Sequence, residues 1–142
     1  MKKFLILLII AFFCLGCQVE KMEKKQACFD NDCYSVEIAK NTYQQAQGLM
    51  DREALGEKEG MLFVYDTEDN QQFWMKNMKF SLDIIWLNNS RKIIDFKENI
   101  SPCEKNPCST YQIDNKSQYV LELPADSIKK NNIKIGDKLI IK

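Results

Sequence analysis

Charged and amide side chains interrupt one of the most apolar stretches of the chain. Residues 73–86 read FWMKNMKFSLDIIW, and Lys76, Asn77 and Asp83 lie inside this segment. In an extended strand alternate side chains share a face, so both faces of the segment begin with apolar residues and are expected to be covered. A buried charge without a partner is costly. Lys76 and Asp83 therefore require partners of opposite charge or hydrogen-bonding groups.

Two more charged residues lie within or directly after apolar segments. Glu122 interrupts the apolar strand pattern YVLELP, and Arg52 follows the segment GLMD. The charges that are available to neutralise one another are balanced in sign. We therefore expect four side chains to converge on one side of the domain, near Trp74: Arg52, Lys76, Asp83 and Glu122.

Two interpretations of this cluster remain open. The first is a satisfied structural network that fixes strand register, since buried ion pairs often do no more than that. The second is a small-ligand pocket in which Asn77 adds an amide and aromatic side chains supply flat surface, namely Phe73, Trp74 and Tyr111. An enzymatic form of the second interpretation uses Asp83 and Glu122 as an acid/base pair, because two carboxylates suffice for glycoside hydrolysis.

Other catalytic and cofactor chemistry is not indicated. The chain has 142 residues and no histidine, which removes the commonest general base and metal ligand. It also has no nucleophile elbow, metal-binding helix motif or phosphate loop, so neither a metal nor another cofactor is predicted. Basic and acidic residues balance at 20 each, and no nucleic-acid surface is expected.

Four of the six cysteines form two C-x4-C pairs, CFDNDC and CEKNPC. In an exported protein an even set indicates disulfides, and three pairings are possible. We favour two local rings because intervals rich in Asp, Asn or Pro turn easily. The rings are Cys28–Cys33 and Cys103–Cys108. A four-thiolate zinc site and a redox dithiol are the alternatives, although catalytic dithiols are typically C-x2-C.

The N-terminus has the layout of a secretory signal peptide. Lys2 and Lys3 precede an apolar run over residues 4–13, which is short for a membrane-spanning helix, and Leu-Gly-Cys follows. This ending resembles the lipobox of bacterial lipoproteins, in which the cysteine is lipidated after cleavage. We expect a signal peptide over 1–16, a lipidated tether over 17–33 that starts at Cys17, and a single globular β-rich domain over 34–142. The chain would then be exported and lipid-anchored to a bacterial membrane.

Strand patterns dominate the expected domain. Alternating or continuous apolar runs predict strands over 34–41, 60–66, 73–78, 82–88, 92–96, 119–124 and 133–142. Thr42 and Gln45 fit a capping box and predict one main helix from Thr42, with Gly48 inside it. The sequence therefore predicts an α+β fold, namely a compact, mostly antiparallel, β-barrel-like sheet with one main helix near the start of the domain.

The order of several motifs resembles the domain of unknown function 192 family, also called uncharacterised protein family 0127. The motifs are GLMDRE, GMLFVY, FWMKNMKFSLDIIW, PCEKNPCSTY and YVLELP. The resemblance covers residues 36–142 and implies a compact β-rich α+β barrel, often exported or membrane-anchored, without an established activity. The chain departs from the family pattern at Met78, Ser81 and Asp126, where threonine, proline and glycine are usual.

These observations predict a membrane-anchored lipoprotein of the cell envelope that acts as a non-enzymatic binding or accessory module. Its partner besides the membrane would be an unknown small ligand or an envelope protein. The alternative is a carboxylate-dependent hydrolase that acts on an envelope glycan. A purely structural partner of another envelope protein is a third possibility.

Overall fold

The computed structural model of the protein describes residues 21–142, so the predicted signal peptide and Cys17 lie outside the described residues. The largest feature of this region is one curled sheet of seven strands. The strands are β1 (Lys24–Phe29), β2 (Asp32–Ala39), β3 (Glu59–Asp69), β5 (Leu82–Leu87), β6 (Ile93–Ile100), β8 (Ser117–Pro124) and β9 (Ile140–Ile141). Their order across the sheet is β6-β5-β8-β3-β2-β1-β9, and only the pair β2–β3 is parallel.

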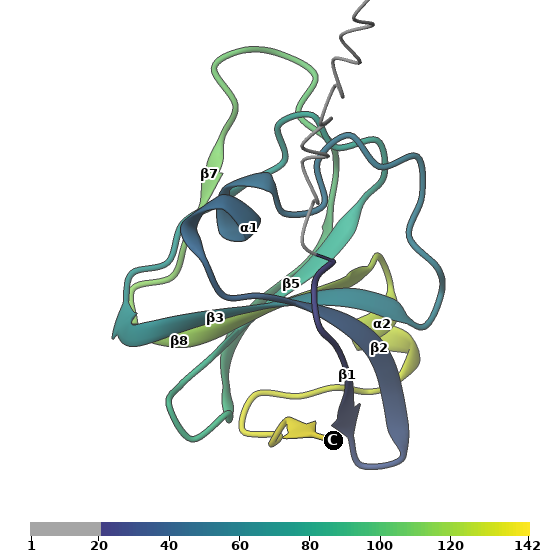
Figure 1. The fold of residues 1–142 in the computed structure, drawn as a ribbon, viewed down its shortest axis with the longest axis vertical. Coiled ribbons are helices and arrows are strands. Elements are labelled where there is room, and N and C mark those ends of the chain that lie inside the picture. Colours follow the sequence, from purple (N-terminus) through teal and green to yellow (C-terminus); the bar gives the residue numbers. More distant parts are fainter. Residues whose placement is uncertain (1–20) are drawn as a thin grey trace, which may run out of the picture.

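Two short helices and a second small sheet complete the described fold. The helix α1 (Thr42–Gln47) lies in the crossover between β2 and β3, and α2 (Ser127–Lys130) follows β8. The small sheet pairs β4 (Phe73–Trp74) with β7 (Thr110–Tyr111). Figure 1 shows α1 and β7 on one side of the central strands, and α2 with the C-terminal segment on the other. The predicted barrel-like sheet is thus confirmed as a half-barrel.

Each face of the sheet carries an apolar cluster. Successive side chains of a strand point to opposite faces, so Leu121 and Leu123 join one cluster, whereas Val120 joins the other. The first cluster also contains Ile85 and Ile128, and we refer to its side as the α2 face. The second cluster lies on the α1 face and includes Met61, Phe63, Phe73, Ile84 and Trp86. Strand β5 is buried along its whole length because β6 and β8 flank it and both of its faces are covered.

The prediction of one main helix near the start of the domain is wrong. α1 has six residues, and its capping box is formed by Asn41 and Gln44 instead of Thr42 and Gln45. The helix ends at Gly48, whose φ of 50° and ψ of −136° suit a residue without a Cβ atom. The sequence pattern predicts a helix that continues past Gly48, but the helix ends at this residue. Within residues 21–142, no helix has the length and apolar character needed to span a bilayer.

The sheet begins inside the segment predicted as a tether. Residues 24–29 form β1, which pairs with β2, and its last three residues are buried: Ala27, Cys28 and Phe29. The charged residues that precede them lie at exposed positions, which is why the sequence looks like a linker. Both predicted disulfides are confirmed: Cys28–Cys33 joins β1 to β2, and Cys103–Cys108 closes the loop before β7.

The strand predicted over 73–78 ends after Trp74. Asn77 has a φ of 55°, and the Met78 amide donates to the carbonyl of Met75, so the chain turns where the pattern continues a strand. Side chains alternate between two faces only within a strand, so this rule does not apply to the residues after Trp74. The strand that is covered on both faces is β5, and it includes only the end of the apolar stretch.

Candidate functional site

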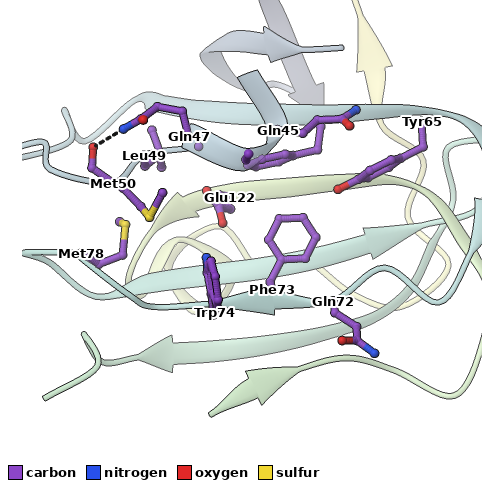
Figure 2. A pocket seen from close by; sticks show the side chains of 13 residues that line it. Gln45, Gln47, Leu49, Met50, Tyr65, Gln72, Phe73, Trp74, Met78 and Glu122 are labelled. Carbon is purple, nitrogen blue, oxygen red and sulfur yellow. Dashed lines mark hydrogen bonds between the residues drawn. The ribbon is translucent and has the colours of Figure 1, made fainter. Parts of the chain in front are cut away.

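A small pocket of about 70 Å³ opens on the α1 face of the sheet, between α1 and β4. Four aromatic residues contribute to its walls: Phe63, Tyr65, Phe73 and Trp74. The turn after α1 adds Leu49 and Met50, while Met78 comes from the turn after β4. Glutamines 45, 47 and 72 add amides at the rim. Figure 2 shows these side chains around a common space.

Glu122 is the one charged side chain among the described residues that line this pocket. It lies on the central strand β8, opposite Met61 of β3 and Ile84 of β5, and it is only 5% exposed. Its carboxyl points from the sheet into the pocket, beneath α1 and beside Trp74 (Figure 2). Gly60 lets β3 approach β8 closely here, since a Cβ atom at Gly60 would lie 2.6 Å from the backbone oxygen of Glu122.

The Glu122 carboxyl has no hydrogen-bonding partner among the described residues, and burial is the main influence on its titration. Desolvation penalises the charged form and raises the pKa of Glu122 to about 8, although the nearby positive charge of Arg52 opposes the rise. Burial and the charge of Glu122 also raise the pKa of Tyr65 to about 12. The pocket therefore holds an uncompensated acid that is mostly protonated at neutral pH.

Arg52 does not form the predicted contact with Glu122. Its guanidinium donates two hydrogen bonds to Glu37, with Nη1 at 3.0 Å from Oε1 and Nη2 at 2.8 Å from Oε2. This bidentate pair lowers the pKa of Glu37 and raises the pKa of Arg52. Arg52 thus influences Glu122 only through its field, because its donors are directed to the carboxylate of β2.

Asp83 belongs to the opposite side of the sheet. It pairs with Leu123 in the register of β5 and β8, so it faces the α2 cluster while Glu122 faces α1. Asp83 is fully buried, and its carboxylate accepts the backbone N–H of Asn99 at 2.8 Å and of Ile128 at 2.9 Å. Its hydrogen bonds therefore connect β6 and α2 to β5. The predicted acid/base pair of Asp83 and Glu122 is not formed, because the sheet separates the two carboxyls.

The other predicted site residues lie at the surface or at the edge of the second cluster. Lys76 is exposed, and its ammonium is 5.3 Å from the centre of the Trp74 ring. Asn77 is exposed in a turn, and Tyr111 is half-buried opposite Phe73. The predicted convergence of four charges is therefore wrong: only Glu122 reaches the pocket, together with Trp74. The cause is the early end of β4, which releases Lys76 to solvent.

Several residues of the pocket are absent from the sequence-based site. Tyr65 ends the apolar run of β3, and its hydroxyl points toward the pocket (Figure 2). Gln45 from α1 spans the pocket wall and donates to the carbonyl of Val64 at 2.8 Å. Met50 and Met78 read as ordinary core residues in the sequence. No spacing rule identifies them, because they meet through two turns that are distant in the sequence. Within residues 21–142, no group of three or more histidine, cysteine or acidic side chains is placed to hold a metal ion.

Comparison with known proteins supports the fold and a family. The family model DUF192, described as Uncharacterized ACR, matches residues 21–141. A crystal structure of a protein from Sinorhizobium meliloti 1021, described as a candidate transcription regulator, superposes with a TM-score of 0.77 at 27% identity, and the match covers 85% of this chain and 95% of that chain. A protein of unknown function from Novosphingobium aromaticivorans DSM 12444 gives a TM-score of 0.74 at 28% identity, with 84% of each chain covered. The comparison with curated proteins found no match.

The buried carboxyl of Asp83 and the exposed ammonium of Lys76 should differ in their effect on stability. Asp83→Ala removes an acceptor from two backbone N–H groups and should lower the free energy of unfolding by about 3–5 kcal/mol. Lys76→Met removes an exposed ammonium, so its loss should stay below about 1 kcal/mol. Urea unfolding of both variants beside the parent measures these values. Equal small losses would contradict the structural role of Asp83.

Glu122 should make stability depend on pH. The pKa of Glu122 is about 8 in the folded state against the ordinary glutamate value of 4.5, so between these values the folded state binds one proton more than the unfolded state. The contribution of Glu122 to stability is then most favourable below about pH 5, and it should lower the free energy of unfolding by up to about 1.4 kcal/mol per pH unit as the pH rises from about 5 to 8.

Glu122→Gln should remove most of this dependence, since glutamine has nearly the same shape and does not titrate. Glu98→Gln is the matched control, because Glu98 is exposed on β6. Urea unfolding followed over the same pH range compares the three slopes. If Glu122→Gln retained the slope of the parent while Glu98→Gln did too, another group would have to be responsible.

Proposed function

The chain belongs to the DUF192 family, and we propose that it is a lipid-anchored binding module of the cell envelope, whose small ligand occupies the pocket at Glu122. The observation that carries this proposal is the buried Glu122 carboxyl, which has no hydrogen-bonding partner within residues 21–142 and points into the pocket. A buried polar group without a partner is destabilising, and a ligand that supplies the partner removes that cost.

The composition of the pocket supports binding more than chemistry. Small-ligand sites combine apolar and aromatic walls with a few polar groups that fix orientation, and this pocket has Phe73 and Trp74 beside the carboxyl of Glu122. General acid/base hydrolysis of a glycan requires a second carboxyl opposite the first. Asp83, the predicted second carboxyl, lies on the other face of the sheet and is bound to two backbone N–H groups.

The N-terminal sequence supports the membrane anchor. The charged start, the apolar run and Leu-Gly-Cys precede the sheet, which begins at Lys24. Only residues 18–23 separate Cys17 from β1, and six residues span at most about 20 Å. A lipid on Cys17 would therefore hold the half-barrel close to the membrane surface, on the exported side. The ligand would then be a molecule that is present in the envelope.

Lipidation is tested by labelling cells with an alkyne fatty acid. The chain should take up the label through Cys17, so Cys17→Ser should abolish it. Cys14→Ser is the matched control, because Cys14 lies within the predicted signal peptide, and this variant should remain labelled. Label retained in Cys17→Ser would exclude the proposed anchor.

The ligand is tested by mass spectrometry of extracts from the purified full-length chain. Ala46 is exposed and lines the pocket, so Ala46→Phe should fill the pocket without disturbing the core. We expect a small molecule in the parent extract that decreases at least about tenfold in Ala46→Phe. Ala54→Phe places the same side chain at another exposed alanine and should retain the molecule. An extract that does not differ between the parent and Ala46→Phe would contradict a ligand in this pocket.

A further inference from the structure

The chemistry of the pocket indicates what class of ligand it takes. We propose that the ligand presents a primary ammonium group, which enters beside Trp74 and donates hydrogen bonds to the carboxylate of Glu122. This inference rests on the proposed binding function and specifies the ligand of the same pocket. The two can fail separately, because a ligand of another class would still be displaced by Ala46→Phe.

Charge is the first argument. Glu122 is the one charged residue among the described residues that line the pocket, and no lysine or arginine lines it. An anionic ligand would find no cation there and would be repelled by Glu122 whenever it is ionised. The donors of Arg52 are directed to Glu37, so they do not serve a second anion. A cation is the ligand that converts the buried acid from a cost into an ion pair.

The aromatic walls favour an organic cation. The indole of Trp74 and the rings of Phe73 and Tyr65 line the same space as the Glu122 carboxyl. Cations bind favourably to the faces of such rings, and tryptophan is the strongest partner. Lys76 already places an ammonium 5.3 Å from the centre of the Trp74 ring, but it does not line the pocket. The Trp74 ring therefore already lies beside one ammonium group of this chain.

The hydrogen-bonding groups and the size of the pocket favour a primary ammonium over other organic cations. No group in the described part of the chain donates a hydrogen bond to the Glu122 carboxyl, and an N–H group would supply that bond, whereas a quaternary ammonium would not. The Tyr65 hydroxyl points to the same space and can accept a second N–H (Figure 2). A space of about 70 Å³ admits only a few atoms, which suits an ammonium group on a narrow stem. Calcium or magnesium requires about six oxygen ligands, and one carboxylate does not provide them.

The protonation of Glu122 predicts how the affinity for the ligand depends on pH. Binding of a cation requires ionised Glu122, whose pKa is raised to about 8, so affinity should rise as the pH increases through this value. The other charged or titratable groups that act on Glu122 do not titrate between about pH 7 and 9. Arg52 is paired with Glu37 and stays charged, and the pKa of Tyr65 is raised to about 12. Alkylammonium groups resemble lysine, with a pKa of about 10.4, and they stay charged over most of this range.

The test is a ligand-detected NMR titration of the full-length chain with ethylammonium at constant ionic strength. A ligand of so few atoms binds at best with a dissociation constant of about 1 mM, so the titration extends through the millimolar range. Affinity should increase about tenfold between pH 7 and pH 9, since the ionised fraction of a group with pKa 8 increases by that factor. Ethanol has the same size without charge and should bind at least tenfold more weakly.

Variants separate the site from general charge. Glu122→Gln and Ala46→Phe should each lower the affinity for ethylammonium at least tenfold at pH 9, and Glu98→Gln should leave it unchanged. Equal binding of ethanol, an affinity that falls as the pH rises, or full affinity in Glu122→Gln would overturn the proposal. If ethylammonium failed while Ala46→Phe still removed the molecule that co-purifies with the parent, the ammonium class would be wrong and the pocket would remain a binding site.

A competition arm identifies the source of the ammonium group. Vesicles that contain phosphatidylethanolamine present it as a lipid headgroup, and phosphatidylcholine vesicles present a quaternary ammonium instead. Displacement of ethylammonium by the first and not by the second supports a lipid ligand. No displacement by either supports a soluble amine, and equal displacement by both would contradict the preference for a primary ammonium.

Discussion

The burial of a carboxyl on the central strand β8 is the constraint on which the α1 face depends. β8 lies between β3 and β5, both of which pair with it around Glu122, and its residues 120–123 are buried on both faces. On the α1 face, Val120 packs into the second apolar cluster and Glu122 follows two positions later on the same face. An apolar residue at 122 would extend the cluster without any cost of desolvation. The carboxyl of Glu122 instead faces the pocket. The end of α1 at Gly48 and the short strand β4 bound this pocket.

The two buried acids show how similar sequence signals lead to different roles. Asp83 and Glu122 both interrupt strands, and both are almost inaccessible to water. Asp83 accepts two backbone N–H groups, so its burial is compensated by the fold, and it ties α2 to β5. Glu122 has no such donor among residues 21–142, and its pKa is raised because desolvation outweighs the opposing charge of Arg52. Compensation by the fold marks Asp83 as a structural residue, and its absence beside an open space is the reason for proposing Glu122 as a binding residue.

Some of this arrangement is predictable from the sequence, and the reasons are local. Apolar runs broken by a charge identify both buried acids, and the two C-x4-C segments identify the disulfides, because these signals lie within a few residues. The pairing of Arg52 with Glu37 is not predictable, since Glu37 reads as a solvent-facing charge on an alternating strand. The donors to Asp83 are backbone amides, which every residue but proline carries, so no residue type reveals them.

The misplacement of Lys76 has a related cause, because turn residues without glycine or proline give a weak signal. The chain leaves β4 through a turn in which Asn77 has a φ of 55°, and neither glycine nor proline marks this turn. Asp126 likewise adopts a φ of 67° where the family pattern has glycine, and asparagine and aspartate are the side chains that tolerate this region best.

The protonation of Glu122 connects the stability of the fold with the occupancy of the pocket. Without a ligand, the neutral acid is the form that the apolar surroundings favour, and the domain keeps its stability by holding that proton. A cation that binds at neutral pH must displace the proton, so the charge inside the pocket is the same before and after binding. The free energy of binding is therefore reduced by the cost of ionisation, which is about 1.4 kcal/mol for each pH unit below the pKa of Glu122. For the proposed ammonium ligand, weak binding in mildly acidic surroundings and release on acidification would follow from the same burial of Glu122.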